Sequence, residues 1–144
     1  MFHPHDQYDD ALLAAILHDT RTIALVGASS KPERPSFSVM RFLLSKGYRV
    51  FPVNPGQAGK EILGQPVYAT LADLPEPVDM VDVFRAADQL SAVVDDVLKM
   101  SPLPRCLWGQ LTVRDDDAAL RAEMVGITVV MDRCPAIEYP RLLG

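Results

Sequence analysis

A short segment near residue 30 combines the polar side chains and the flexible backbone that bind phosphate groups. It reads Gly27-Ala28-Ser29-Ser30-Lys31, with Arg34 close behind and a helix expected from about Ser36. Glycine permits a sharp turn, and the first turn of a helix presents unpaired N–H groups at the positive end of its dipole. The two cations suit a ligand with more than one phosphate. The alternative is an ordinary capped loop with solvated charges.

The same segment departs from the best-defined nucleotide-binding patterns. A dinucleotide fingerprint needs further glycines after Gly27, and a nicotinamide enzyme usually places an acid at the end of the second strand, where this chain has Val53-Asn54-Pro55. Pro32 stands where a P-loop needs its second glycine. An ATPase is therefore not expected, and an NAD(P)-dependent enzyme remains only as an alternative.

Apolar runs alternate with amphipathic segments along the whole chain. We expect strands at 22–26, 49–53, 78–84, 106–108 and 127–131, a short strand at 66–68, and helices at 9–18, from about 36, at 90–98 and at 115–124. This alternation predicts an α/β fold of the Rossmann-like, doubly wound class, with three layers and a mostly parallel sheet of five to six strands.

Ligands of such sheets bind beyond the carboxyl ends of the strands, so the residues at that edge are candidates in advance. The edge is expected to gather Gly27 to Lys31 with Arg34, Asn54-Pro55, Arg85, Gly109-Gln110 and Asp132-Arg133-Cys134. Their polarity alone proves little, because loops are polar everywhere.

Composition limits the classes of function. The chain has 144 residues, 49% hydrophobic and 23% charged, and a net charge of −5. We expect a single domain over residues 1–144 with a leading segment, 1–20, that carries an amphipathic helix. The acidic balance argues against a nucleic-acid partner, and no apolar run is long enough to span a membrane. The N-terminus does not resemble a signal peptide, so we expect a cytoplasmic protein with reduced thiols.

Several segments, in one order, resemble the small CoA-binding proteins. They are Gly27 to Arg34, Gly47 to Pro55, Val81 to Arg85, Trp108 to Gln110 and Val130 to Cys134. The resemblance runs from about Thr22 to Leu142 and implies the CoA-binding domain that also opens the α subunit of succinyl-CoA synthetase. The ligand implied is a small molecule of nucleotide type, coenzyme A or an acyl-CoA.

The resemblance also implies binding residues for each part of CoA. The phosphates would meet Gly27, Ala28, Ser29, Ser30, Lys31 and Arg34; the adenosine would lie along Val53, Asn54 and Pro55; and the pantetheine would be flanked by Phe84, Arg85, Ala86 and Gln110. A nucleotide-binding lysine follows the second strand in the synthetase, where this chain offers either Gln57 or Lys60. The family often has glycine where this chain has Thr112.

No catalytic centre is implied. The synthetase uses a phosphorylated histidine in a second domain, whereas the histidines here are His3, His5 and His18. We therefore expect a binding, carrier or sensor module, with a homodimer or a protein partner left open. His3-Pro4-His5-Asp6 is not expected to bind a metal, because terminal residues are usually mobile and two histidines with one aspartate rarely suffice.

Other reactive side chains have structural explanations. Cys134, beside Arg133, is a catalytic candidate for exchange with a CoA thiol or disulfide, although a buried structural role is favoured. Cys106 and Trp108 are expected in the core, and Asp115 to Asp117 at a helix start. Asp79 and Asp82 lie on a predicted buried strand and need hydrogen-bond partners.

Overall fold

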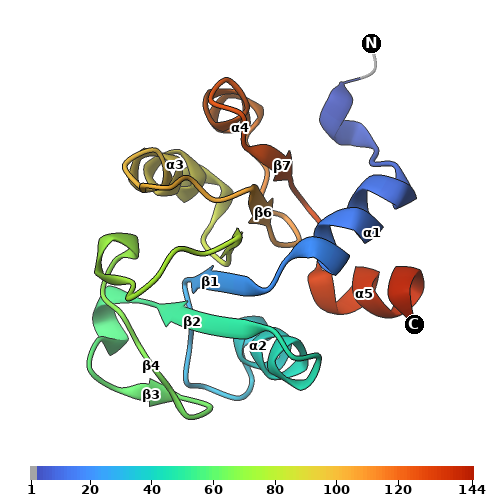
Figure 1. Cartoon of the computed structure of the whole chain (residues 1–144). Helices are drawn as coiled ribbons and strands as arrows, with labels where there is room; N and C mark the ends of the chain where they lie inside the picture. Colours follow the sequence, from blue (N-terminus) through green and yellow to red (C-terminus); the bar gives the residue numbers. More distant parts are fainter. Residues whose placement is uncertain (1–2) are drawn as a thin grey trace.

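A five-stranded parallel sheet forms the centre of the computed structural model, which describes residues 3–144. Its strands are β1 (Thr22–Val26), β2 (Arg49–Val53), β5 (Met80–Val83), β6 (Cys106–Gly109) and β7 (Thr128–Val130), in the spatial order β2-β1-β5-β6-β7 (Figure 1). The strand order reverses between β1 and β5. In doubly wound sheets this switch point opens the ligand crevice at the carboxyl edge.

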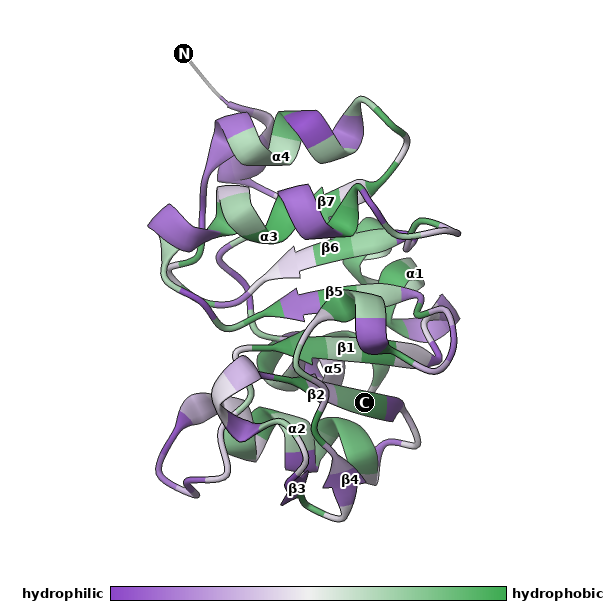
Figure 2. Cartoon of the chain, turned by 90° about the vertical axis from the view of Figure 1, so that its left-hand side faces the viewer, coloured by the Kyte–Doolittle hydropathy of each residue, from purple (hydrophilic) through white to green (hydrophobic). Residues whose placement is uncertain are grey.

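Helices cover both faces of the sheet. They are α1 (Asp10–Asp19), α2 (Pro35–Ser45), α3 (Leu90–Val97), α4 (Asp116–Glu123) and α5 (Pro135–Leu143). Helices α3 and α4 pack on one face, and α1, α2 and α5 pack on the other (Figure 1). Most of each strand is buried from both sides, which explains the mostly apolar strand sequences and the mostly green sheet in Figure 2.

Short elements connect these layers. Single 3₁₀ turns lie at Pro4–Asp6, Pro55–Gln57, Leu71–Asp73 and Ala87–Gln89, and β3 (Glu61–Ile62) pairs antiparallel with β4 (Gln65–Pro66). An isolated bridge joins Val53 to Tyr68 at the outer edge of β2. The hairpin and this bridge together lie beside the edge strand.

The structure confirms the predicted fold class and five strands in the main sheet, all parallel. The leading helix, the helix after Arg34 and the two later helices form within about two residues of their expected bounds. The short strand expected at 66–68 shrinks to Gln65–Pro66 and the Tyr68 bridge. Helix α5 was not expected, and it packs against α1 although Pro140 lies inside it.

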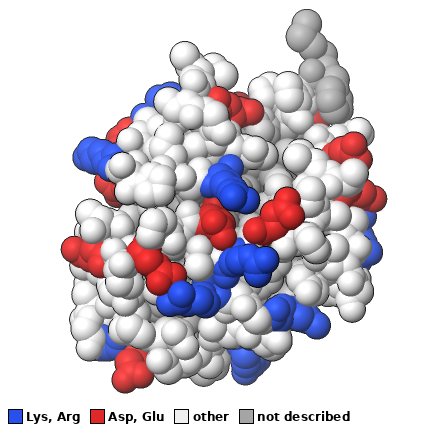
Figure 3. Space-filling view, viewed as in Figure 1, with Lys and Arg blue, Asp and Glu red and all other residues white. Residues whose placement is uncertain are grey.

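Charges of both signs alternate on the face seen in Figure 3. Some charged side chains form ion pairs, such as Arg49 with Glu76 at 2.8 Å. None of the helices within residues 3–144 is long and apolar enough to cross a membrane.

Candidate functional site at the carboxyl edge of the sheet

The turn after β1 depends on the absence of a side chain at Gly27. Its φ is +88°, and a Cβ there would stand 2.7 Å from the carbonyl oxygen of Phe84. The Gly27 amide donates to Val53 O at 2.9 Å, which fastens the turn to the end of β2. A residue with a side chain would be strained in this conformation and would collide with the backbone just after β5.

Asn54 joins the loops after β1 and β2. Its Nδ2 donates to Ala28 O at 2.7 Å, and its Oδ1 accepts from the Gly56 amide at 2.9 Å. The predicted residues Val53, Asn54 and Ala28 thus lie together. Val53 and Ala28 are buried, so these two can offer a ligand mainly their backbone.

Helix α2 begins beside this turn without a side-chain cap. Arg34 is its N-cap and makes no capping hydrogen bond, and Pro35 follows as the first helical residue. Ser29 Oγ instead accepts from the Lys31 amide at 3.1 Å, which shapes the loop in front of the helix. The positive end of the helix dipole and two exposed cations therefore face the same space.

That space is a hollow of about 420 Å³, called here the phosphate-loop hollow. It is lined by Gly27, Ala28, Ser29, Lys31, Arg34, Pro35, Ser36, Asn54, Gln57 and Phe84. Of the two candidates after β2, Gln57 lines the hollow, and Ser30 Oγ donates to its Oε1 at 3.4 Å. Lys60 is exposed near the β3–β4 hairpin and does not line it.

A second hollow, of about 230 Å³, opens on the other side of the Val53-to-Pro55 turn, and we call it the β2–β5 hollow. It is lined by Val26, Val53, Pro55, Ala69, Thr70, Leu71, Arg85, Gln89, Ala92, Val93 and Asp96. Phe84 and Arg85 therefore separate, with Phe84 in the phosphate-loop hollow and Arg85 in this one. Ala86 is exposed just beyond them.

The loops after β6 and β7 form the other half of the edge. Thr112 and Asp132 have φ values of +71° and +58°, in the left-handed region that favours glycine, and the Thr112 amide donates to Asp132 Oδ1 at 2.7 Å. Gln110 is buried, and its Oε1 has no hydrogen-bond partner among residues 3–144. Buried polar atoms are usually paired, so this oxygen is an unsatisfied acceptor, although Gln110 lines neither of the two hollows.

The two aspartates of the β5 region behave differently. Asp79 is half-buried and lies just before β5 rather than on the strand, and its Oδ2 accepts from the amides of Arg21 and Thr22 at 2.9 and 3.2 Å. Asp82 is fully buried, and neither of its carboxyl oxygens has a hydrogen-bond partner within residues 3–144. Burial raises the pKa of Asp82 well above its ordinary value. Burial and the nearby Asp82 also raise the pKa of the Cys106 thiol.

The other reactive candidates are buried or make hydrogen bonds within the fold. Cys134 is 5% exposed at the N-cap of α5, and both cysteines are free. Trp108 is fully buried and donates its Nε1–H to Arg133 O at 2.9 Å, as expected of a core tryptophan. Asp115 caps α4 by accepting from the Ala118 amide at 3.1 Å. Exchange chemistry at Cys134 stays a prediction.

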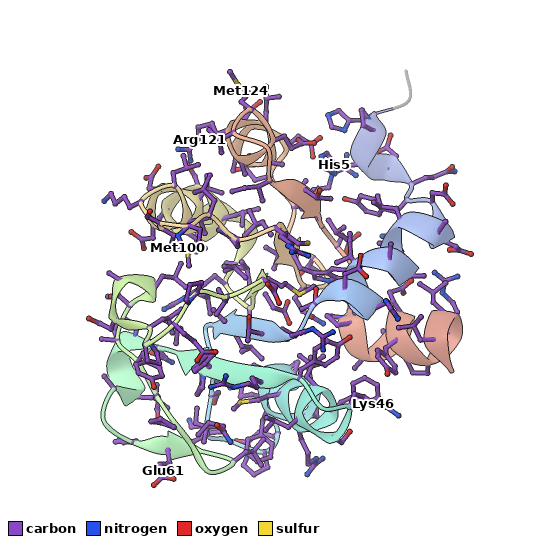
Figure 4. All side chains as sticks on the ribbon, in the orientation of Figure 1. His5, Lys46, Glu61, Met100, Arg121 and Met124 are labelled. Atoms are coloured by element: carbon purple, nitrogen blue, oxygen red, sulfur yellow. The ribbon has the colours of Figure 1, made fainter. Side chains whose placement is uncertain are left out.

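The histidines lie away from the two hollows. His5 is buried beside α4, where Figure 4 labels it, and His18 is exposed near the end of α1. Within residues 3–144 no group of three or more His, Cys, Asp or Glu side chains is arranged to hold a metal ion. Residues 3–8 contact α4 and the end of β7 through His5 and Tyr8.

A parallel sheet that reverses its strand order beside a glycine turn and an uncapped helix places this chain in the Rossmann-like α/β class. Sequence comparison specifies the class further. Residues 21–140 match the CoA binding domain, and the chain belongs to that family.

This chain is similar to proteins of about its own length and to part of a longer enzyme subunit. YneT of Bacillus subtilis is 34% identical over 130 residues, which are 90% of this chain and 93% of YneT. A solved Thermus thermophilus protein has a TM-score of 0.88 at 40% identity, covering 94% of this chain and 100% of that one. The α subunit of the ADP-forming acetate–CoA ligase I of Pyrococcus furiosus is 28% identical over 66% of this chain, but only 22% of that subunit is covered.

Proposed function

We propose that this protein binds coenzyme A or an acyl-CoA at the carboxyl edge of the sheet and acts as a binding, carrier or sensor module without catalysing a reaction itself. The observation that carries the proposal is the Gly27 turn, where a Cβ would meet the Phe84 carbonyl oxygen and where α2 begins uncapped. Such an arrangement suits the close approach of a diphosphate to backbone N–H groups.

The residues present fit CoA along its length. Ser29, Lys31 and Arg34 surround the phosphate-loop hollow, and this hollow would hold the phosphates. The β2–β5 hollow, with Arg85 at its wall and Val53 at its floor, would hold the adenosine. Gln110 Oε1, buried and unpaired among residues 3–144, would accept a hydrogen bond from an amide of the pantetheine arm once that arm displaces the atoms that cover it. When bound, CoA would supply a thiol, which is the group that carries acyl chains.

Two observations favour a module without catalysis. The match covers only about a fifth of the acetate–CoA ligase subunit, so the match by itself carries no catalytic activity over to this chain. The described histidines also lie outside the two hollows, which removes the side chain that a phosphohistidine mechanism needs. The small relatives, in contrast, match over nearly their full lengths.

Titration calorimetry with CoA, acetyl-CoA, NAD and ATP tests the proposal. We expect saturable binding of CoA and acetyl-CoA only, and a loss of at least tenfold in affinity for the variant with Ser29→Ala and Arg34→Ala, because charge-assisted bonds to phosphate contribute about 1.5–3 kcal/mol each. The control carries Ser45→Ala and Arg105→Ala, which remove the same side-chain types from exposed positions before β2 and β6. Uptake of NAD or ATP in place of CoA contradicts the proposal.

A further inference from the structure

The segment before α1 lies outside the part of the chain that matches the CoA-binding family, yet it makes specific contacts with the crevice loops. The family match begins at residue 21, whereas Tyr8 reaches across to the end of β7. The Met131 amide donates to Tyr8 Oη at 2.8 Å, and the Arg133 guanidinium lies 5.1 Å from the centre of the Tyr8 ring. One side chain therefore holds the loop after β7 by a hydrogen bond and by a cation–π contact.

Tyr8 is itself held in place by a buried histidine. His5 is 7% exposed, and its Nδ1 lies 2.7 Å from Tyr8 Oη, while its Nε2 lies 3.2 Å from Glu123 Oε1 on α4. Since Tyr8 Oη accepts from the Met131 amide, its hydrogen is free to be donated to His5 Nδ1, and His5 Nε2–H then donates to Glu123. A continuous series of hydrogen bonds therefore runs from Glu123 on α4 through His5 and Tyr8 to the Met131 amide after β7.

The loop that Tyr8 holds is bonded in turn to the loop that carries Gln110. Asp132 Oδ1 accepts from the Thr112 amide at 2.7 Å, and the Arg133 amide donates to Gly109 O at 3.3 Å. Thr112 and Asp132, whose backbone φ angles lie in the left-handed region, are in these two loops. A conformation of this kind persists only where its surroundings hold it, and Tyr8 is part of those surroundings.

We infer that Tyr8 is a positioning residue for the pantetheine end of the ligand site, acting through the Met131-to-Cys134 loop on Gln110. The inference rests on the proposed binding of CoA. It assigns the segment 3–8 a part in ligand affinity. The phosphate-loop half of the crevice is taken as independent of it, since the hydrogen bonds and the cation–π contact of Tyr8 within residues 3–144 go to His5, Met131 and Arg133.

Calorimetry on Tyr8→Phe with two probes tests this assignment. CoA reaches both halves of the edge, whereas adenosine 3′,5′-bisphosphate lacks the pantetheine arm. Loss of one well-placed hydrogen bond should weaken CoA binding about three- to tenfold and leave the affinity for the bisphosphate within twofold of the wild type. Emission from Trp108, the only tryptophan, should change as well, because its indole donates to Arg133 O.

Tyr48→Phe is the matched control. Tyr48 also donates a buried hydrogen bond, to Leu17 O, but it lies at the amino edge of the sheet, so both affinities should be unchanged. Equal weakening of both probes by Tyr8→Phe, or no weakening of either, overturns the assignment. A wild-type protein that binds the bisphosphate and not CoA, or neither probe, instead contradicts the proposed function.

Discussion

At the β1–β2 half of the carboxyl edge the chain turns through Gly27 at φ +88°, whereas at the β6–β7 half it turns through Thr112 at +71° and Asp132 at +58°. The first half adopts its left-handed turn with the one residue that does so freely. The second half uses residues with side chains, at about 1–2 kcal/mol each, and is held by bonds between its loops and to Tyr8. The residue type at position 27 therefore sets the backbone conformation of the β1–β2 half, whereas tertiary contacts hold the conformation of the β6–β7 half.

The largest effect is expected from a side chain in the first half. Gly27→Ala should lower the free energy of unfolding by about 2–4 kcal/mol, because it adds backbone strain and a clash with the Phe84 carbonyl oxygen. Urea denaturation measures this. Gly126→Ala is the control, since Gly126 has φ +91° with open space around it, and should lose only about 1 kcal/mol. Equal losses would mean that the close approach to Phe84 is not what demands glycine.

A second prediction concerns β5, the strand that separates the two halves. Because burial raises the pKa of Asp82, its protonated form contributes stability that is complete below the unfolded-state pKa of about 3.9 and is lost as the pH rises through the folded-state pKa. Asp82→Asn should therefore gain stability relative to the wild type with increasing pH, by up to about 1.4 kcal/mol per pH unit in that window.

Urea denaturation between pH 4 and about pH 8 tests this pH dependence. Asp88→Asn provides the control, because Asp88 is exposed at the start of the turn before α3. The prediction is wrong if the stability difference between Asp82→Asn and the wild type does not change with pH, as expected for Asp88→Asn. Asp82 is then ionised in the folded protein, and the core contains a paired charge rather than a neutral acid.

The smallest effect should be a gain in stability in the second half. Thr112→Gly removes the left-handed strain at φ +71° and loses part of that gain to the greater entropy of glycine in the unfolded chain, for a net stabilisation of about 0.5–1 kcal/mol. Thr128→Gly, in the extended strand β7, should instead destabilise by a similar amount. Thermal melts of both variants would show opposite shifts. A destabilised Thr112→Gly would mean that the threonine side chain itself supports the loop.

The same contrast explains what the sequence could predict. The Gly27 turn, the apolar strands and the helices after them are local patterns, and their positions follow from spacing and from glycine chemistry. The contacts of Tyr8 with Met131 and of His5 with Glu123 join residues 123 and 118 positions apart, which no local pattern signals. Helix α5 escaped prediction because Pro140 breaks its pattern, and it forms through tertiary packing against α1.

The bridge between Val53 and Tyr68 has a consequence for association in solution. The outer edge of β2 contains Pro52, which has no N–H, and the Pro52 oxygen and the Asn54 amide are both bonded to Tyr68. A strand from another molecule therefore finds fewer open backbone groups there than on a bare edge strand. The short strand β7 is the other edge, and Tyr8 occupies the Met131 amide just beyond its end. Each edge of the sheet is thus partly shielded against strand addition.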